Sequence, residues 1–122
     1  LLTINGLVAS REIIIPVQCE YYALEGLSQL LNTIGLIKEH LQPELEILGA
    51  VMTMYDGRNK LSNDVFNDLY KNFPARIFRS VIPRNVKVAE SPSHGSPLKD
   101  YAPNSVGSNA YKRLAQEVIL AK

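Results

Sequence analysis

Three short runs of apolar, largely β-branched residues alternate along this chain with longer stretches of helical periodicity. The runs cover residues 13–17, 47–53 and 77–82, and each is bounded by Pro or by Asp-Gly. Runs of this length are typical of strands. Parallel strands need long crossover connections, so alternating strands and helices favour a parallel sheet with right-handed crossovers. We therefore predict an α/β fold.

The helical stretches lie before, between and after these runs. Apolar residues recur there at every third or fourth position, in residues 1–8, 23–41, 65–73 and 111–119. We predict Ser62 as the N-cap of the third helix, with Asp64 in its first turn. Residues 90–107 are rich in Ser, Pro, Gly and Asn, so we expect a functional loop or a covering segment.

A sheet of three strands is thin for a parallel sheet, which is normally buried on both faces. We expect the first run, residues 13–17, to be covered on both faces. The chain starts at Leu1 with no Met and no signal-peptide pattern. We interpret residues 1–122 as one portion of a larger α/β domain.

Charge is distributed unevenly along the chain, although the net charge is only +1. Residues 1–55 carry two basic and six acidic side chains, and the remainder carries eleven basic and six acidic ones. Residues 58–87 include seven basic side chains and only two acidic ones. This window is either a solvated surface or a binding site for a polyanion.

Several kinds of site are absent from the sequence. Neither G-x-x-x-x-G-K-[ST] nor G-x-G-x-x-G occurs, so we expect no nucleotide-phosphate site within the chain. Cys19, His40 and His94 lack metal-ligand spacing, and Ser93 beside His94 is a poor nucleophile pair. We interpret Cys19 as a small buried residue, compatible with a reducing cytoplasm. The longest apolar run, five residues, is too short to span a membrane.

Polar residues follow each predicted strand. Glu20 and Glu25 follow the first, and the segments 53–56 and 83–85 follow the other two. Open α/β sheets bind ligands at the carboxyl ends of their strands, so these positions predict a shared site. For the two glutamates, a favourable interaction with the helix N-terminus is the simpler interpretation.

Four segments together resemble the C-terminal half of ParA/Soj chromosome-partitioning ATPases. They are IPVQCEYYALEGL at 15–27, TMYD at 53–56, VIPRNV at 81–86 and SPSHG at 91–95. The resemblance covers nearly the whole chain and implies a P-loop NTPase domain of the SIMIBI/MinD-like type. The Walker A motif and the D-x-P-P-x-x-G segment of the family would lie upstream of Leu1.

The resemblance also implies an activity and partners for the parent protein. Family members bind ATP and Mg²⁺, dimerise around ATP, bind DNA without sequence preference and respond to a ParB-type centromere-binding protein. Such a protein would be cytoplasmic and associated with the nucleoid. We expect no ATP hydrolysis from this segment alone, and no tightly bound cofactor, because the phosphate-binding motif is missing.

Individual residues take roles from the same resemblance. Positions implied to lie near the nucleotide are Thr53 and Met54 beside the adenine, Pro83, Arg84 and Asn85 in the loop over the base, and Glu20. The positions implied in DNA binding are Arg58, Arg84 and Lys87. Ser96 and Lys99-Asp100 depart from the residues common in the family at those positions.

The sequence therefore predicts part of an ATPase that partitions chromosomes or plasmids. The alternative is an autonomous α/β module that binds a protein partner without nucleotide. The residues encoded before Leu1 would separate the two. We further expect self-association as a dimer or higher oligomer, because an unpaired strand edge, at residues 13–17 or 47–53, recruits another chain.

Overall fold

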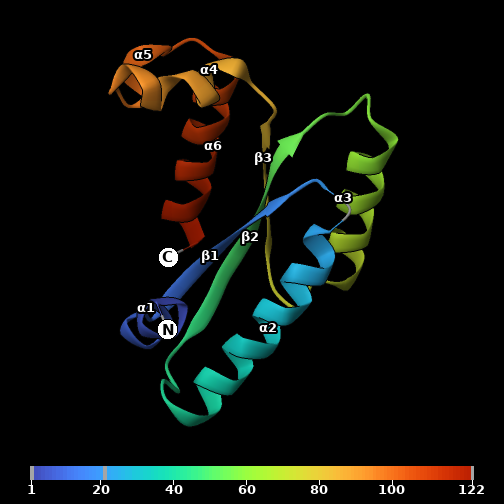
Figure 1. Ribbon diagram of the computed structural model, residues 1–122, viewed down its shortest axis with the longest axis vertical. Helices are drawn as coiled ribbons and strands as arrows, with labels where there is room; N and C mark the ends of the chain where they lie inside the picture. The colour runs from blue at the N-terminus through green and yellow to red at the C-terminus, as the bar shows by residue number, and fades with distance from the viewer. Residues whose placement is uncertain (1, 21, 122) are drawn as a thin grey trace.

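The computed structural model describes residues 2–20 and 22–121 (Figure 1). Leu1, included in the first predicted helix, lies outside the described residues. The elements are α1 (Leu2–Ala9), β1 (Glu12–Gln18), α2 (Ala23–His40), β2 (Glu46–Tyr55), α3 (Lys60–Asn72), β3 (Ile77–Pro83), α4 (Val86–Glu90), the 3-10 helix η1 (Ser91–His94), α5 (Leu98–Tyr101) and α6 (Val106–Ala121).

The three strands form one sheet in the order β1-β2-β3, and both strand pairs are parallel. Of the two candidate edge strands, residues 13–17 lie at an edge, but the expectation for residues 47–53 is wrong, because β2 is paired on both sides. The crossover helices α2 and α3 lie on one side of the sheet, and α6 lies on the other (Figure 1). Gln18 is paired with Thr53, and Tyr55 with Pro83, so the strands end together at one edge. The predicted three-stranded parallel sheet with flanking helices is confirmed.

The core has a cluster on each side of the sheet. Ala50 and Met52 belong to the cluster that contains the buried residues of α2 and α3. Val51, between them in sequence, belongs to the cluster that β3 forms with α6. All three are almost fully buried. Because side chains alternate along a strand, β2 is the strand that is buried on both faces.

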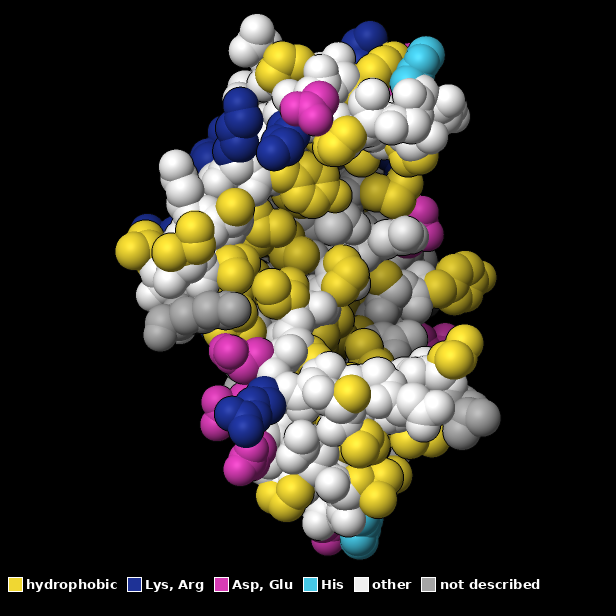
Figure 2. Space-filling view, turned by 90° about the vertical axis from the view of Figure 1, so that its left-hand side faces the viewer, with side chains coloured by type: hydrophobic (Ala, Val, Ile, Leu, Met, Phe, Trp, Pro, Cys, Tyr) yellow, Lys and Arg dark blue, Asp and Glu magenta, His cyan; other side chains and the backbone are white. Residues whose placement is uncertain are grey.

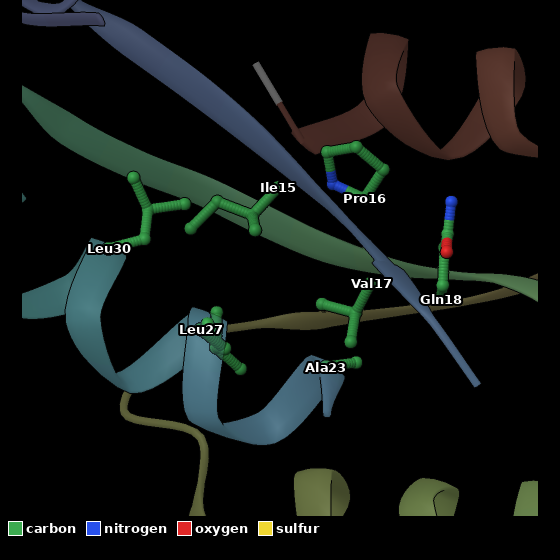
Figure 3. A pocket seen from close by; sticks show the side chains of 8 residues that line it. Ile15, Pro16, Val17, Gln18, Ala23, Leu27 and Leu30 are labelled. Carbon is green, nitrogen blue, oxygen red and sulfur yellow. The ribbon is translucent and has the colours of Figure 1, made fainter. Parts of the chain in front are cut away.

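The prediction that the first strand is covered on both faces is wrong. Ile15 and Val17 are buried against α2, but Ile14 is 39% exposed. Figure 3 shows Ile15 and Val17 pointing toward α2, while Pro16 and Gln18 point away. The physical reason is that α6 packs on β3 and leaves the second face of β1 bare. Figure 2 shows hydrophobic side chains exposed across the middle of this side of the molecule.

The start of α3 also differs from the prediction. Asn59 is the N-cap, and its side-chain oxygen accepts a hydrogen bond from the backbone N–H of Leu61 at 2.8 Å. Ser62 instead lies buried inside the helix, where its hydroxyl accepts a 3.5 Å hydrogen bond from the Asp56 amide. Asp64 lies beyond the first turn. Both Asn and Ser cap helices, so the choice between them depended on where the chain leaves β2.

The segment expected to be a functional loop or a covering segment contains short helices. Within residues 90–107 the chain forms η1 and α5 before α6 begins. Pro92 lies at the start of η1, where it needs no backbone donor, and Gly95 ends η1 with φ of 65°. Pro97 is the N-cap residue of α5. In the described part of the chain no helix is both long and apolar enough to cross a membrane.

Candidate functional site

A cavity of about 440 Å³ opens at the carboxyl ends of the strands. Every strand contributes to it, together with the chain after β3, α4 and α6. Its lining consists of Gln18, Thr53, Met54, Ile82, Pro83, Arg84, Asn85, Val88, Ala89 and Tyr111. The volume and the mainly apolar walls are typical of a small-molecule site.

Five of the six residues predicted near a nucleotide line this one cavity: Thr53, Met54, Pro83, Arg84 and Asn85. The sixth, Glu20, does not line it and lies exposed in a bend after β1. The parallel register explains the convergence, because it brings the ends of β2 and β3 to the same edge. The roles of these residues at a nucleotide stay predictions.

The backbone of the site continues the sheet beyond its strands. The Cys19 amide donates to the Thr53 carbonyl at 3.1 Å, and the Arg84 amide donates to the Tyr55 carbonyl at 3.1 Å. Met54 has φ of 54°, a left-handed conformation that is costly for a residue with a Cβ. Two flanking hydrogen bonds therefore hold a strained residue at the cavity wall.

Gln18 and Tyr111 line the cavity but were not predicted. Gln18 lies within the segment 15–27 that carries the family resemblance and is the last residue of β1, so its place at a strand end was a usable signal. Tyr111 comes from α6 and carried no such signal, because its position depends on how α6 packs on β3. It is 42% exposed and is the only aromatic side chain among the described lining residues.

The donor set of the cavity suits a planar group with polar edges. The Gln18 amide and the Thr53 hydroxyl offer both donors and acceptors. The side-chain oxygen of Asn85 accepts a 2.8 Å hydrogen bond from the Lys87 amide, which leaves the Asn85 N–H₂ group for a ligand. Met54 and Tyr111 supply apolar faces. A heteroaromatic base has these properties.

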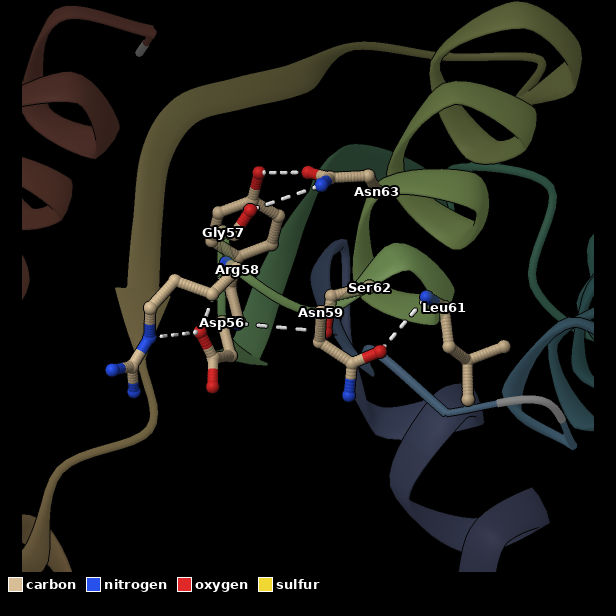
Figure 4. A network of polar contacts seen from close by, with 8 residues as sticks. Asp56, Gly57, Arg58, Asn59, Leu61, Ser62 and Asn63 are labelled. Atoms are coloured by element: carbon tan, nitrogen blue, oxygen red, sulfur yellow. Dashed lines mark hydrogen bonds and ion pairs between the residues drawn. The ribbon is translucent and has the colours of Figure 1, made fainter.

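Arg58, one of the predicted DNA-binding residues, lies in the turn after β2. Its side chain is 93% exposed, and the Asp56 carboxylate accepts hydrogen bonds from its backbone N–H at 3.0 Å and from Nε at 3.3 Å (Figure 4). These two bonds, with the charges of Arg58 and Arg84, lower the pKa of Asp56. Asp56 therefore orients Arg58 and partly neutralises it.

Lys87 lies on α4 in a second small cluster. Its Nζ is 3.4 Å from the Glu90 carboxylate and 5.7 Å from the centre of the Tyr101 ring. The Tyr101 hydroxyl donates to Glu90 at 2.8 Å, which lowers the pKa of Glu90 and raises that of Tyr101. His94 stacks on the same ring at 4.6 Å. This packing fixes where the Lys87 charge lies.

The three predicted DNA-binding residues lie toward the carboxyl ends of the strands: Arg58 follows β2, Arg84 follows β3, and Lys87 is on α4. Figure 2 shows Lys and Arg side chains gathered toward the upper end of the molecule, where the strands finish in Figure 1. Arg84 is exposed and forms no ion pair within the described chain. The structure therefore places Arg58, Arg84 and Lys87 around the edge that holds the cavity.

Cys19 and the two histidines do not form a reactive group. Burial raises the pKa of the Cys19 thiol to about 11, so the thiolate is disfavoured, as expected for an inert buried cysteine. His40 lies near Glu39 at the end of α2, far in sequence from His94 in η1. Among the described residues, no three His, Cys, Asp or Glu side chains gather in a way that could hold a metal ion.

Comparison with known proteins supports a specific relationship. A family model described as an AAA domain matches residues 1–47. The chain is 52% identical over 118 residues to the sporulation initiation inhibitor protein Soj of Bacillus subtilis (strain 168). It is 48% identical over 118 residues to the chromosome partitioning protein ParA of Caulobacter vibrioides (strain NA1000 / CB15N). Both matches cover 97% of this chain.

The chain belongs to the Soj/ParA family. It spans about half the length of these curated relatives, 47% of the Bacillus protein and 44% of the Caulobacter protein. The resemblance to this family that the four segments indicated is confirmed.

A solved structure with the same arrangement supports the fold. Cobyrinic acid a,c-diamide synthase from Mycobacterium smegmatis superimposes with a TM-score of 0.75 at 32% identity, over 97% of this chain and 41% of that one. The same protein has also been solved with bound ADP and magnesium. The sheet and flanking helices of this Soj/ParA family member are thus those of a P-loop ATPase-like fold.

Proposed function

We propose that residues 1–122 are the C-terminal part of a Soj/ParA-type ATPase domain that acts in chromosome or plasmid partitioning. The observation that carries the proposal is the strand-end cavity, where five residues assigned to the nucleotide by resemblance come together. Family membership, with half the length of the relatives, supports the same conclusion.

In this proposal the chain supplies contacts to the base of ATP, and residues outside it supply those to the phosphates and Mg²⁺. The cavity offers apolar faces and amide or hydroxyl groups, which fit a purine. The sequence contains no Gly-rich phosphate loop, and the described residues include no carboxylate cluster that could hold a metal ion beside the phosphates. When bound, Mg²⁺ would neutralise phosphate charge during hydrolysis.

The remaining functions concern the parent protein. We propose that Arg58, Arg84 and Lys87 contact DNA phosphates, because exposed Arg and Lys side chains bind the backbone without reading sequence. ATP-dependent dimerisation, a ParB-type partner and a cytoplasmic, nucleoid-associated location belong to the same proposal. Their support is the relationship to partitioning proteins.

Adenosine binding tests the central claim. Ligand-observed NMR should detect adenosine, but not ribose, binding to the chain, and ATP should bind little better than adenosine. Ala89→Trp should abolish the signal because Ala89 lines the cavity and the indole would fill it. Ala115→Trp on α6 is the matched control, because Ala115 is exposed and does not line the cavity.

Two results would contradict the proposal. One is the absence of adenosine binding to the unmodified chain, which would favour the interaction module that works without nucleotide. The other is equal binding by the Ala89→Trp and Ala115→Trp variants, which would place the base elsewhere.

A further inference from the structure

Two of the three residues proposed to contact DNA each lie against a carboxylate that is close to them in sequence. The Arg58 Nε lies 3.3 Å from Asp56 Oδ1, and the Lys87 Nζ lies 3.4 Å from Glu90 Oε2. Arg84, the third residue, forms no ion pair within the described chain. Two of the three positive charges are therefore paired within the protein.

The turn after β2 fixes the Asp56 carboxylate beside Arg58. Asp56 Oδ1 accepts hydrogen bonds from the backbone N–H of Arg58 at 3.0 Å and from its Nε at 3.3 Å (Figure 4). The terminal nitrogens of the guanidinium make no hydrogen bond or ion pair with the described residues. A phosphate bound to those nitrogens would share one guanidinium with the Asp56 carboxylate, so the two anions would repel each other.

Tyr101 holds the second carboxylate in place. Its hydroxyl donates to Glu90 Oε2 at 2.8 Å, and the Lys87 Nζ lies 3.4 Å from the same oxygen. The Tyr101 hydrogen bond and the Lys87 charge lower the pKa of Glu90, which keeps this carboxylate ionised at neutral pH. A lysine side chain is flexible and has three donors, so Lys87 can exchange Glu90 for a phosphate.

The exchange of a carboxylate for a phosphate releases few counterions. A free basic side chain displaces a cation from DNA when it binds a phosphate, and this release drives binding that does not depend on sequence. When the side chain has to leave a carboxylate, that carboxylate takes up a cation, and the net release falls. Arg84 has no such competitor among the described residues.

We propose that two carboxylates, Asp56 and Glu90, lower the affinity for DNA by competing with its phosphates. Asp56 competes for Arg58 and Glu90 competes for Lys87, which leaves Arg84 as the principal phosphate contact. Both are positioning residues, because each acts on DNA only through the basic side chain that it holds. This inference rests on the proposed DNA contacts and adds to them what limits their strength.

Isosteric amides test the proposal. Asp56→Asn and Glu90→Gln remove the charge but keep an oxygen for the hydrogen bonds from the Arg58 amide and the Tyr101 hydroxyl. Fluorescence anisotropy with a labelled DNA duplex of random sequence measures affinity over a salt series. Each variant should bind about two- to fivefold more tightly, the range for an exposed ion pair. The double variant should also depend more steeply on salt.

The contacts at the opposite end of the sheet supply the matched control. Glu44 lies 3.5 Å from Arg11, and Glu39 lies 3.8 Å from His40. Glu44→Gln with Glu39→Gln removes the same number of charges, before β2 begins and where α2 ends. This control should change the affinity for DNA by less than about twofold, because exposed charges far from the bound phosphates are screened by salt.

Double-mutant cycles separate competition from simple repulsion of DNA. On an Arg58→Gln background, Asp56→Asn should no longer raise the affinity, because no guanidinium remains to be released. A second cycle combines Lys87→Gln with Glu90→Gln in the same way. The two pairs are independent, so one cycle decides if a variant of the other pair does not fold.

Three results would overturn the inference. They are equal or weaker DNA binding by Asp56→Asn and Glu90→Gln, a gain that persists without Arg58 or Lys87, and a smaller loss from Arg84→Gln than from Arg58→Gln. Each of these leaves DNA binding itself in place. Failure of the proposed function looks different, because then neither the unmodified chain nor any variant binds the duplex, and the inference falls with it.

Discussion

Glu117 on α6 is predicted to stabilise the edge strand β3 through its carboxylate. One oxygen accepts a hydrogen bond from the Arg79 amide at 2.8 Å, and the other accepts one from the Ser80 amide at 2.7 Å. Successive amides of a regular strand point in opposite directions. Here the register of β3 against β2 shifts across this segment, so both amides reach the same carboxylate.

Glu117→Gln removes one of the two hydrogen-bond acceptors that the Arg79 and Ser80 amides use. The Gln oxygen still accepts one hydrogen bond, but its N–H₂ group then faces an amide N–H. Hydrogen bonds to charged groups contribute about 1.5–3 kcal/mol each. Because the carboxylate is only partly buried, we take the lower part of this range and expect a loss of about 2 kcal/mol in the free energy of unfolding.

Urea denaturation at pH 7 measures the effect, and the midpoint should fall by about 1 M. The amides of Arg79 and Ser80 should also exchange faster with solvent. Glu12→Gln is the control, because that exposed carboxylate on β1 has no hydrogen bond or ion pair with the described residues, and it should leave the midpoint nearly unchanged. Equal midpoints for Glu117→Gln and the unmodified chain would refute the reasoning.

The same contact predicts a pH dependence. Partial burial by itself raises the pKa of Glu117, but hydrogen bonds from Ser80 and Arg79 outweigh it and hold the pKa below its usual value. When the pKa of a carboxyl group is lower in the folded than in the unfolded protein, the charged group stabilises the fold fully at any pH above its pKa in the unfolded protein, near 4.3. This contribution is lost as the pH falls through the pKa of the folded protein. The difference between Glu117→Gln and the unmodified chain should therefore shrink below about pH 4.

Three further predictions concern the proposed functions. The double variant Arg58→Glu, Arg84→Glu should bind DNA of any sequence more weakly at low salt. The control, Arg11→Glu with Lys38→Glu at the opposite end of the sheet, should reduce DNA binding much less. Filter binding over a salt series measures both variants, and identical curves would disprove the assignment of the DNA-binding residues. Purified chain should release no phosphate from ATP above a buffer blank, and turnover that scales with protein through repurification would contradict this. Light scattering should show a dimer or larger species that Ile14→Thr weakens, because Ile14 lies on the bare face of β1; a 13.6 kDa monomer at high concentration would show that three strands suffice.

Much of the fold followed from local patterns. Residues 13–17, 47–53 and 77–82 all lie within strands, and the periodic stretch 23–41 nearly coincides with α2. Because parallel strands end at a common edge, the sequence also predicted that Thr53 and Pro83 would come together, and both line the strand-end cavity. These features depend on neighbours in sequence and on one rule of topology.

Local patterns failed where two choices were locally equivalent. Ser62 and Asn59 are both good caps, and only the path of the chain from β2 selected Asn59. Ile14 and Ile15 are equally apolar, yet only Ile15 is buried, because no helix covers the other face of β1. The burial of a residue depends on which element packs against it, and a periodic sequence pattern does not indicate which element that is.

The strands, the long helices and the edge at which a ligand site would form follow from the sequence alone, because these features depend on side-chain period and on parallel connection. Which distant residues share a site depends instead on how the elements pack. Tyr111 reaches the strand-end cavity, and Glu117 reaches the amides 37 and 38 residues earlier, through the packing of α6 on β3. Such contacts depend on the angle and position of a whole helix, which no short segment specifies.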